Sequence, residues 1–139
     1  MQRTMQISAA LDYAIQVTGA AHVSALGIGS CALPLLLASC MDPRLRPLAL
    51  ARCQISWDDL FQERNYFLPE TSIVPGLPEI ADLPRLCALS DATVFNPLRA
   101  DGQPYTREEV RREERLSCIW KEDLPMALEQ WFQEREGCL

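Results

Sequence analysis

The chain has 139 residues, of which 48% are hydrophobic and 23% are charged, and its formal net charge is −6. This composition is typical of a folded globular protein, so we expect residues 1–139 to form a single domain with one core. The acidic balance leaves no basic stripe that could neutralise phosphates, and it therefore argues against a nucleic-acid partner.

The six cysteines show no CxxC spacing, and several lie in apolar segments where a thiol behaves as a small hydrophobic side chain. We expect them to be mostly buried and reduced, which favours a cytoplasmic setting. With one histidine and no paired cysteines, we expect no zinc, no other metal and no cofactor. The first segment lacks the order of a signal peptide, and the longest apolar run, Ala32 to Ala38, is too short to cross a membrane.

In the N-terminal part, apolar residues at helical spacing predict a helix over 4–17, which Gly19 ends. A short apolar strand follows over 22–26, then a turn with the sequence GIGSCA, and then a helix over 30–41. A second apolar strand is predicted over 48–53. Two strands joined through a helix make a βαβ unit, which predicts a parallel sheet with a right-handed crossover.

The remaining part begins with a stretch rich in proline. From Ser56 to Asp91 the prolines predict an excursion of short helices and turns rather than sheet. A third strand is predicted over 92–95, a charged helix over 106–115, a fourth strand over 116–120 and a closing amphipathic helix over 123–134. The predicted fold class is therefore α/β, a partial parallel sheet of about four strands flanked by helices.

The glycine turn fits more than one interpretation. The nucleophile elbow of a serine hydrolase has the pattern Gly-x-Ser-x-Gly, with small flanking residues on a strained strand-to-helix turn. With Gly27 as the first glycine, the nucleophile position falls on Gly29, and no nucleophile is present. With Ser30 as the nucleophile, the flanking positions hold Ile28 and Ala32, and we expect the β-branched Ile28 to clash.

Two further interpretations concern the same turn. Gly27-x-Gly29-x-x-Ala32 matches the dinucleotide-binding pattern G-x-G-x-x-G/A after a strand and before a helix. That pattern requires an acidic residue about 20 residues further on, where this chain has Arg52, a side chain that could receive a 2′-phosphate. In the structural interpretation, the glycines permit a tight turn and a close approach of helix to strand, and no ligand is involved.

Longer stretches resemble the α/β-hydrolase superfamily. HVSALGIGSCALPLLLASCMDPRLRPLAL resembles the elbow strand, the elbow, the following helix and the next strand of that fold. SWDDLFQERNYFLPETSIVPGLPEIADLPRLCAL is similar to the next segment of acetyl-xylan-esterase-like and dienelactone-hydrolase-like members, and TVFNPLRADGQPYT to the strand and loop that carry their triad acid. The resemblance covers residues 8–135 and corresponds to the C-terminal half of a degenerate hydrolase copy.

The resemblance implies catalytic positions, and this chain leaves them empty. The nucleophile position falls on Gly29, and the acid position falls at Arg99, with Asp101 nearby as a substitute. The catalytic histidine should follow the fourth strand, where the chain has Lys121-Glu122-Asp123, and His22 comes too early to replace it. Because the triad acts as a unit, loss of the nucleophile or the base removes roughly six orders of magnitude in rate.

We therefore expect a catalytically degenerate, esterase-related half-domain that serves as a structural or interaction module. The elbow strand is central in a full hydrolase sheet, so its bare edge is expected to pair with a second copy or with a partner chain that completes the sheet. Two alternatives stay open. One is a carboxylic-ester hydrolase that uses Ser30 or Cys31 together with a histidine of a partner chain, and the other is a dinucleotide-binding module.

Several other side chains are candidates for a site or for the core. Cys31 lies near a predicted helix N-terminus, where a thiolate is stabilised. Trp57, Tyr66 and Phe67 could line a pocket above the sheet. We expect Trp120, Trp131 and Phe132 to lie in the core where the last strand meets the last helix.

Overall fold

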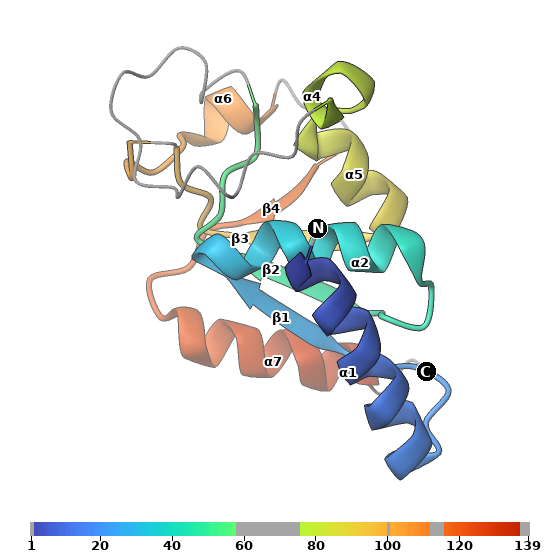
Figure 1. Cartoon of the computed structure of the whole chain (residues 1–139). Coiled ribbons are helices and arrows are strands. Elements are labelled where there is room, and N and C mark those ends of the chain that lie inside the picture. The colour runs from blue at the N-terminus through green and yellow to red at the C-terminus, as the bar shows by residue number, and fades with distance from the viewer. Residues whose placement is uncertain (1, 58–75, 100, 112–115, 137–139) are drawn as a thin grey trace.

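The computed structural model describes residues 2–57, 76–99, 101–111 and 116–136. These residues form a parallel sheet of four strands with helices on both faces (Figure 1). The predicted α/β class, with a partial parallel sheet of four strands, is therefore confirmed. The strands lie side by side in chain order and are β1 (Ala25–Ile28), β2 (Leu48–Ala51), β3 (Ala92–Phe95) and β4 (Ser117–Ile119).

The two central strands are buried on both faces because they carry apolar or small side chains at every position. β2 is Leu-Ala-Leu-Ala and β3 is Ala-Thr-Val-Phe, and every residue of both is buried. Such runs are typical of parallel sheets that are covered on both sides. The segments that follow the strands meet along one edge, called here the carboxyl edge, where open α/β sheets bind ligands. The last residues of the strands pair across the sheet in the order Ile28, Ala51, Phe95 and Ile119.

Most helices contribute to the core on one face of the sheet. Leu50 and Val94 point into this core, and their neighbours along each strand point to the other face, because successive residues of a strand alternate. α1 packs against α2, and α2 packs against α5 and the first two strands (Figure 1). The helices of this face are α1 (Gln2–Thr18), α2 (Ala32–Met41), α4 (Leu77–Ile80), α5 (Leu83–Ser90) and α6 (Arg107–Arg111).

The opposite face is covered by α7 (Leu124–Glu136) (Figure 1). Trp131 of this helix packs in one cluster with Ala49 and Ala51 of β2 and Phe95 of β3. Its ring meets that of Phe95 edge to face, with 6.0 Å between the ring centroids. No helix in the described part of the chain is both long enough and apolar enough to span a membrane.

The first strand lies further along the chain than the sequence predicts. β1 begins at Ala25 and not at residue 22, so Gly27 lies inside the strand rather than in the turn. β2 ends before Arg52, because this residue adopts the left-handed conformation with a φ of 50° and turns the chain out of the sheet. The turn after β1 therefore begins at Gly29 rather than at Gly27, and Arg52 lies beyond the end of β2 rather than inside it.

The predictions for the C-terminal part are met in part. The charged helix predicted over 106–115 corresponds to α6, described over Arg107–Arg111, and residues 112–115 lie outside the described part of the chain. The prediction that three aromatic residues lie where the last strand meets the last helix is confirmed for Trp131 and Phe132, which pack with Ile119, and is wrong for Trp120. Its side chain packs in the core on the other face, and its indole N–H donates to the carbonyl of Tyr105 at 3.3 Å.

β1 is an edge strand of the sheet that the described residues form. Gly27 faces α2, so the alternation of the strand turns Leu26 and Ile28 to the face of α7. The core under α7 is built from the other three strands and does not include either side chain. Leu26 is therefore 38% exposed and Ile28 51% exposed, and together they leave an apolar strip along the edge.

A cluster of ion pairs joins α1 to the loop between α2 and β2. Nε of Arg44 donates to the two carboxylate oxygens of Asp42 at 3.0 and 3.1 Å, and the guanidinium also donates to Asp12 of α1 at 2.7 Å. The backbone N–H of Arg44 donates to Asp42 as well, at 3.0 Å. Because these hydrogen bonds favour the charged carboxylate, they lower the pKa of Asp42 to about 2.

This cluster predicts a loss of stability in acid. Since the pKa of Asp42 is lower in the folded chain than in the unfolded one, its contribution to stability is present above pH 4 and is lost as the pH falls toward 2. Urea unfolding at pH 6 and at pH 3 measures this loss. The difference in the free energy of unfolding between the two pH values should be smaller in Asp42→Asn than in the wild type, and an equal difference would contradict the assignment.

Candidate functional site

The turn between β1 and α2 has the backbone geometry of a strand-to-helix elbow. Gly29 follows the strand directly and has a φ of 55°, in the left-handed region that side chains disfavour. The chain then forms a short 3₁₀ helix, η1 (Gly29–Cys31), before α2 begins at Ala32. The helix predicted over 30–41 therefore starts as a tighter turn. An added Cβ on Gly29 would meet no atom within 4 Å, so this position faces open space.

Gly27 is required for a different reason, which is the close approach of α2 to β1. A Cβ on Gly27 would lie 2.8 Å from the Cα of Ala32 and 3.1 Å from Cδ2 of Leu35. The first of these atoms is backbone and cannot move aside without shifting the helix. The two glycines thus have different roles. Gly29 permits the turn, and Gly27 permits the packing of α2 against β1.

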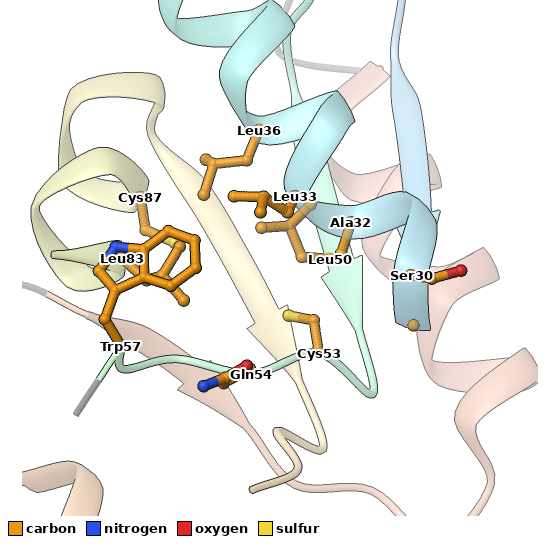
Figure 2. A pocket seen from close by; sticks show the side chains of 11 residues that line it. Ser30, Ala32, Leu33, Leu36, Leu50, Cys53, Gln54, Trp57, Leu83 and Cys87 are labelled. Atoms are coloured by element: carbon orange, nitrogen blue, oxygen red, sulfur yellow. The ribbon is translucent and has the colours of Figure 1, made fainter. Parts of the chain in front are cut away.

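A small apolar cavity lies beside the turn at the carboxyl edge (Figure 2). Its volume is about 30 Å³. An apolar cavity that accepts benzene has a volume of about 150 Å³, so this one admits only a group the size of a methyl or a water molecule. Its lining residues are Gly29, Ser30, Ala32, Leu33, Leu36, Leu50, Cys53, Gln54, Trp57, Leu83 and Cys87.

Trp57 is the largest side chain in the wall of the cavity, and Asp82 fixes its position. Asp82 accepts the backbone N–H of Trp57 at 2.9 Å and the hydroxyl of Ser56 at 3.1 Å. The same carboxylate caps α5 by accepting the N–H of Leu83 at 2.8 Å, and the indole N–H of Trp57 donates to the Ala81 carbonyl at 3.1 Å. Sequence analysis missed Asp82, although an Asp followed by Leu-Pro is a helix-start signal.

The structure separates the two candidate nucleophiles of the turn. Ser30 is half-buried and lines the cavity, and Figure 2 shows its hydroxyl directed away from Trp57. Cys31 is exposed at the N-cap of α2 and is a free thiol. Neither residue occupies the left-handed position of the elbow, which belongs to Gly29. Tyr66 and Phe67, predicted beside Trp57, lie outside the described residues.

The positions expected for the triad acid are taken up by structural contacts. Arg99 forms an ion pair with Glu109 of α6. Asp101 accepts the backbone N–H of Gln103 at 2.9 Å and thereby shapes the loop after β3. This loop closes on itself, since Arg99 also accepts the N–H of Gly102 at 2.9 Å. Neither side chain is therefore held ready to orient a histidine.

The expected position of the histidine is also structural. Lys121 follows β4 and donates its backbone N–H to the side chain of Asn96 at 2.8 Å. Asp123 accepts the N–H of Met126 at 3.1 Å at the start of α7. His22 is exposed and precedes β1, so it lies toward the amino end of the strand, whereas Ser30 follows the carboxyl end.

The residue directly after each of three neighbouring strands has a positive φ. Gly29, Arg52 and Asn96 follow β1, β2 and β3 and have φ angles of 55°, 50° and 45°. The strand register aligns these positions along the carboxyl edge. A non-glycine residue in this conformation costs on the order of 1–3 kcal/mol, and asparagine tolerates it better than most. The chain therefore leaves the sheet abruptly at each of these strands.

Burial makes the thiols of the core poor nucleophiles. It raises the pKa of Cys53 and of Cys118 to about 12, and it also raises the pKa of Cys87 and of Cys40. A thiol with a raised pKa is protonated at neutral pH and attacks slowly. Cys53 and Cys87 therefore act as apolar walls of the cavity. The free thiols in the described part of the chain are Cys31, Cys40, Cys53, Cys87 and Cys118.

Because the two glycines have distinct roles, alanine and asparagine should rank in opposite order of stability at the two positions. Gly27→Ala should lower the free energy of unfolding by about 1–3 kcal/mol, because the added Cβ overpacks the helix. Gly29→Ala should cost about 1–2 kcal/mol through its φ alone. Asparagine tolerates a positive φ, so Gly29→Asn should be milder than Gly29→Ala, whereas Gly27→Asn should be worse than Gly27→Ala. Chemical denaturation of the four variants tests this, and one order at both positions would contradict it.

Known proteins give no further assignment for the turn or the cavity. No protein-family model, no curated protein and no solved structure matches this chain. The hydrolase resemblance accordingly depends on the sequence stretches, and the dinucleotide-binding interpretation of the turn stays a prediction.

Proposed function

We propose that this chain is a catalytically degenerate, esterase-related half-domain of the α/β-hydrolase type that works as an interaction module. The observation that carries the proposal is Gly29, which has a φ of 55° at the strand-to-helix turn where hydrolases of this type hold their nucleophile. Gly27, two residues before Gly29, packs against Ala32. The first position of the elbow pattern requires such a small residue. A glycine at the central position cannot attack a substrate.

The contacts of the other expected catalytic positions support the same proposal. Arg99 and Asp101 hold the loop after β3, and Asp123 caps α7. Loss of a triad member removes roughly six orders of magnitude in rate, and the residual catalysis requires an intact oxyanion hole. In hydrolases one donor of that hole comes from a loop of the N-terminal half of the fold, which this resemblance does not include.

A reducing, cytoplasmic setting agrees with this proposal. The cysteines of the described residues are free thiols. Burial raises the pKa of most of them, so these raised pKa values do not indicate a catalytic thiol. Disulfides are rare in proteins of the cytoplasm.

Hydrolysis of p-nitrophenyl acetate by the purified chain tests the loss of catalysis. We expect the wild type, Ser30→Ala and Cys31→Ala to give the same rate as buffer, because neither side chain occupies the elbow position. Free imidazole is added in a second series to replace a histidine that a partner chain would supply. A rate above the blank that disappears in one variant, with or without imidazole, would identify a working nucleophile and contradict the proposal.

We further propose that the partner is a second copy of this chain, which pairs along β1. Antiparallel pairing centred on Gly27 would place Leu26 opposite the partner's Ile28, and the same contact would recur on the other side of the two-fold axis. Both side chains are exposed on the face of the sheet that α7 packs against, and pairing with a second strand would cover them. An edge strand with unpaired backbone groups and apolar side chains favours such pairing.

Light scattering of the purified chain measures this association. Ile28→Lys should weaken the dimer at least about tenfold, because it places a charge in the interface between the two paired strands. Ile80→Lys is the matched control, since Ile80 is 75% exposed on α4 and should leave the dimer unchanged. A wild-type chain that stays monomeric at high concentration would contradict pairing with a second copy.

A further inference from the structure

A groove runs along the other end of the sheet, beside β4. β4 is the last strand in the order of the sheet, and it pairs with β3 alone among the described residues. The groove has a volume of about 550 Å³ and is open to solvent. It is called here the β4 groove. Its walls come from α6 and from β4 with the residues beside it, and include Arg107, Arg111, Cys118, Ile119 and Trp120.

The groove is lined by residues of β4 whose side chains point to opposite faces of the sheet. Cys118 packs against the core on the side of α2 and α5, whereas Ile119 packs against the core under α7. Since the lining also includes α6, we infer that the groove lies along the outer side of β4. The backbone groups on that side have no sheet partner in the described part of the chain. An added strand could therefore pair there.

Two arginines give the β4 groove a positive charge. Arg107 and Arg111 are four residues apart on α6, so they lie on the same side of the helix, and both are exposed. Within the described part of the chain neither is ion-paired with a carboxylate, whereas Arg44 and Arg99 are. Two guanidinium groups with no ion pair to a described residue are notable in a chain whose net charge is −6.

Trp120 adds a fixed aromatic surface to the wall of the groove. Its indole N–H donates to Tyr105, which holds the side chain in place. The guanidinium carbon of Arg107 lies 5.8 Å from the centre of its ring, within the range of a cation–π contact. This contact positions Arg107 while leaving its N–H groups available to a carboxylate.

We propose that the β4 groove binds an extended acidic segment of a partner protein, which adds a strand to the free edge of β4. Side chains two residues apart on a strand are about 7 Å apart and point to the same side. Side chains four residues apart on a helix are separated by about 6 Å. Carboxylates at alternate positions of the segment therefore match the spacing of Arg107 and Arg111.

This proposal concerns a different edge from the β1 pairing, and it does not depend on the loss of catalysis. Backbone hydrogen bonds to β4 would supply affinity, and the two arginines would select acidic side chains. Apolar side chains at the intervening positions of the segment would point to the opposite face of the sheet, on the side of Ile119. The recognised chemistry is thus an alternating acidic and β-branched sequence in an extended conformation.

The test uses a fluorescein-labelled peptide of alternating Val and Glu, and fluorescence anisotropy reports its binding to the full chain. We expect saturable binding that weakens as the salt concentration rises from about 0.05 to about 0.5 M, because salt screens exposed charges. A peptide of alternating Val and Lys should not bind. Absence of saturable binding by the acidic peptide, or equal binding of the basic one, would overturn the proposal.

Charge reversal in the groove assigns the site. Arg107→Glu/Arg111→Glu should weaken binding of the acidic peptide at least about tenfold and allow the basic peptide to bind. The control is Arg3→Glu/Arg85→Glu, which changes the net charge equally at exposed positions of α1 and α5. Circular dichroism verifies that both variants are folded. Equal loss of binding in the two variants would show a general effect of charge and overturn the site.

Strand addition requires backbone pairing, which a modified peptide tests separately. Methylation of alternate backbone nitrogens removes donors to β4 without changing the charge of the peptide. Such a peptide should bind at least about tenfold more weakly. Hydrogen exchange should also slow at residues 117–119 when the unmodified peptide binds. Equal affinity of the methylated peptide would show that the groove binds charge alone and would overturn strand addition.

Discussion

The contact between Gly27 and Ala32 is the constraint on which the rest of the structure depends. With no side chain at Gly27, α2 lies directly against β1, and the distance of 2.8 Å from an added Cβ to the helix backbone shows how little space remains. This contact sets the level of α2 over the sheet, where Leu36 packs with Leu50 in the core. The chain turns sharply just beyond this contact, at Gly29, which has a φ of 55°.

Under the proposed function, the same constraint explains how the frame of a hydrolase could persist without catalysis. The elbow, the parallel strands and the helix behind them form one packed unit that requires small residues at defined places. The side chains that hydrolases use are separate from this packing, because they project from strand ends into open space. After β1, β2 and β3 this chain has Gly29, Arg52 and Asn96, whose positive φ angles turn the chain out of the sheet. The proposed partners bind at the two edges of the sheet.

The sequence predicted the order of the elements well, because apolar runs alternate with glycine and proline at the right spacing. β3 has the predicted bounds of 92–95, since a turn residue stands on each side. The start of β1 could not be predicted, because the pairing with β2 decides where the ladder begins. The cap that Asp82 gives α5 has a local signal, but its hydrogen bond from Trp57 and the β4 groove could not be predicted. Both depend on contacts between distant segments that no local pattern encodes.

The central claim is that the turn retains the shape of a nucleophile elbow and has lost its nucleophile. Reaction with a fluorophosphonate ester tests it most directly, because this reagent phosphonylates activated serine nucleophiles and leaves ordinary hydroxyls unmodified. The account predicts that the intact mass of the chain is unchanged after incubation. A single adduct that maps to Ser30 would contradict it, since it would show that a residue outside the left-handed position of the elbow is an activated nucleophile.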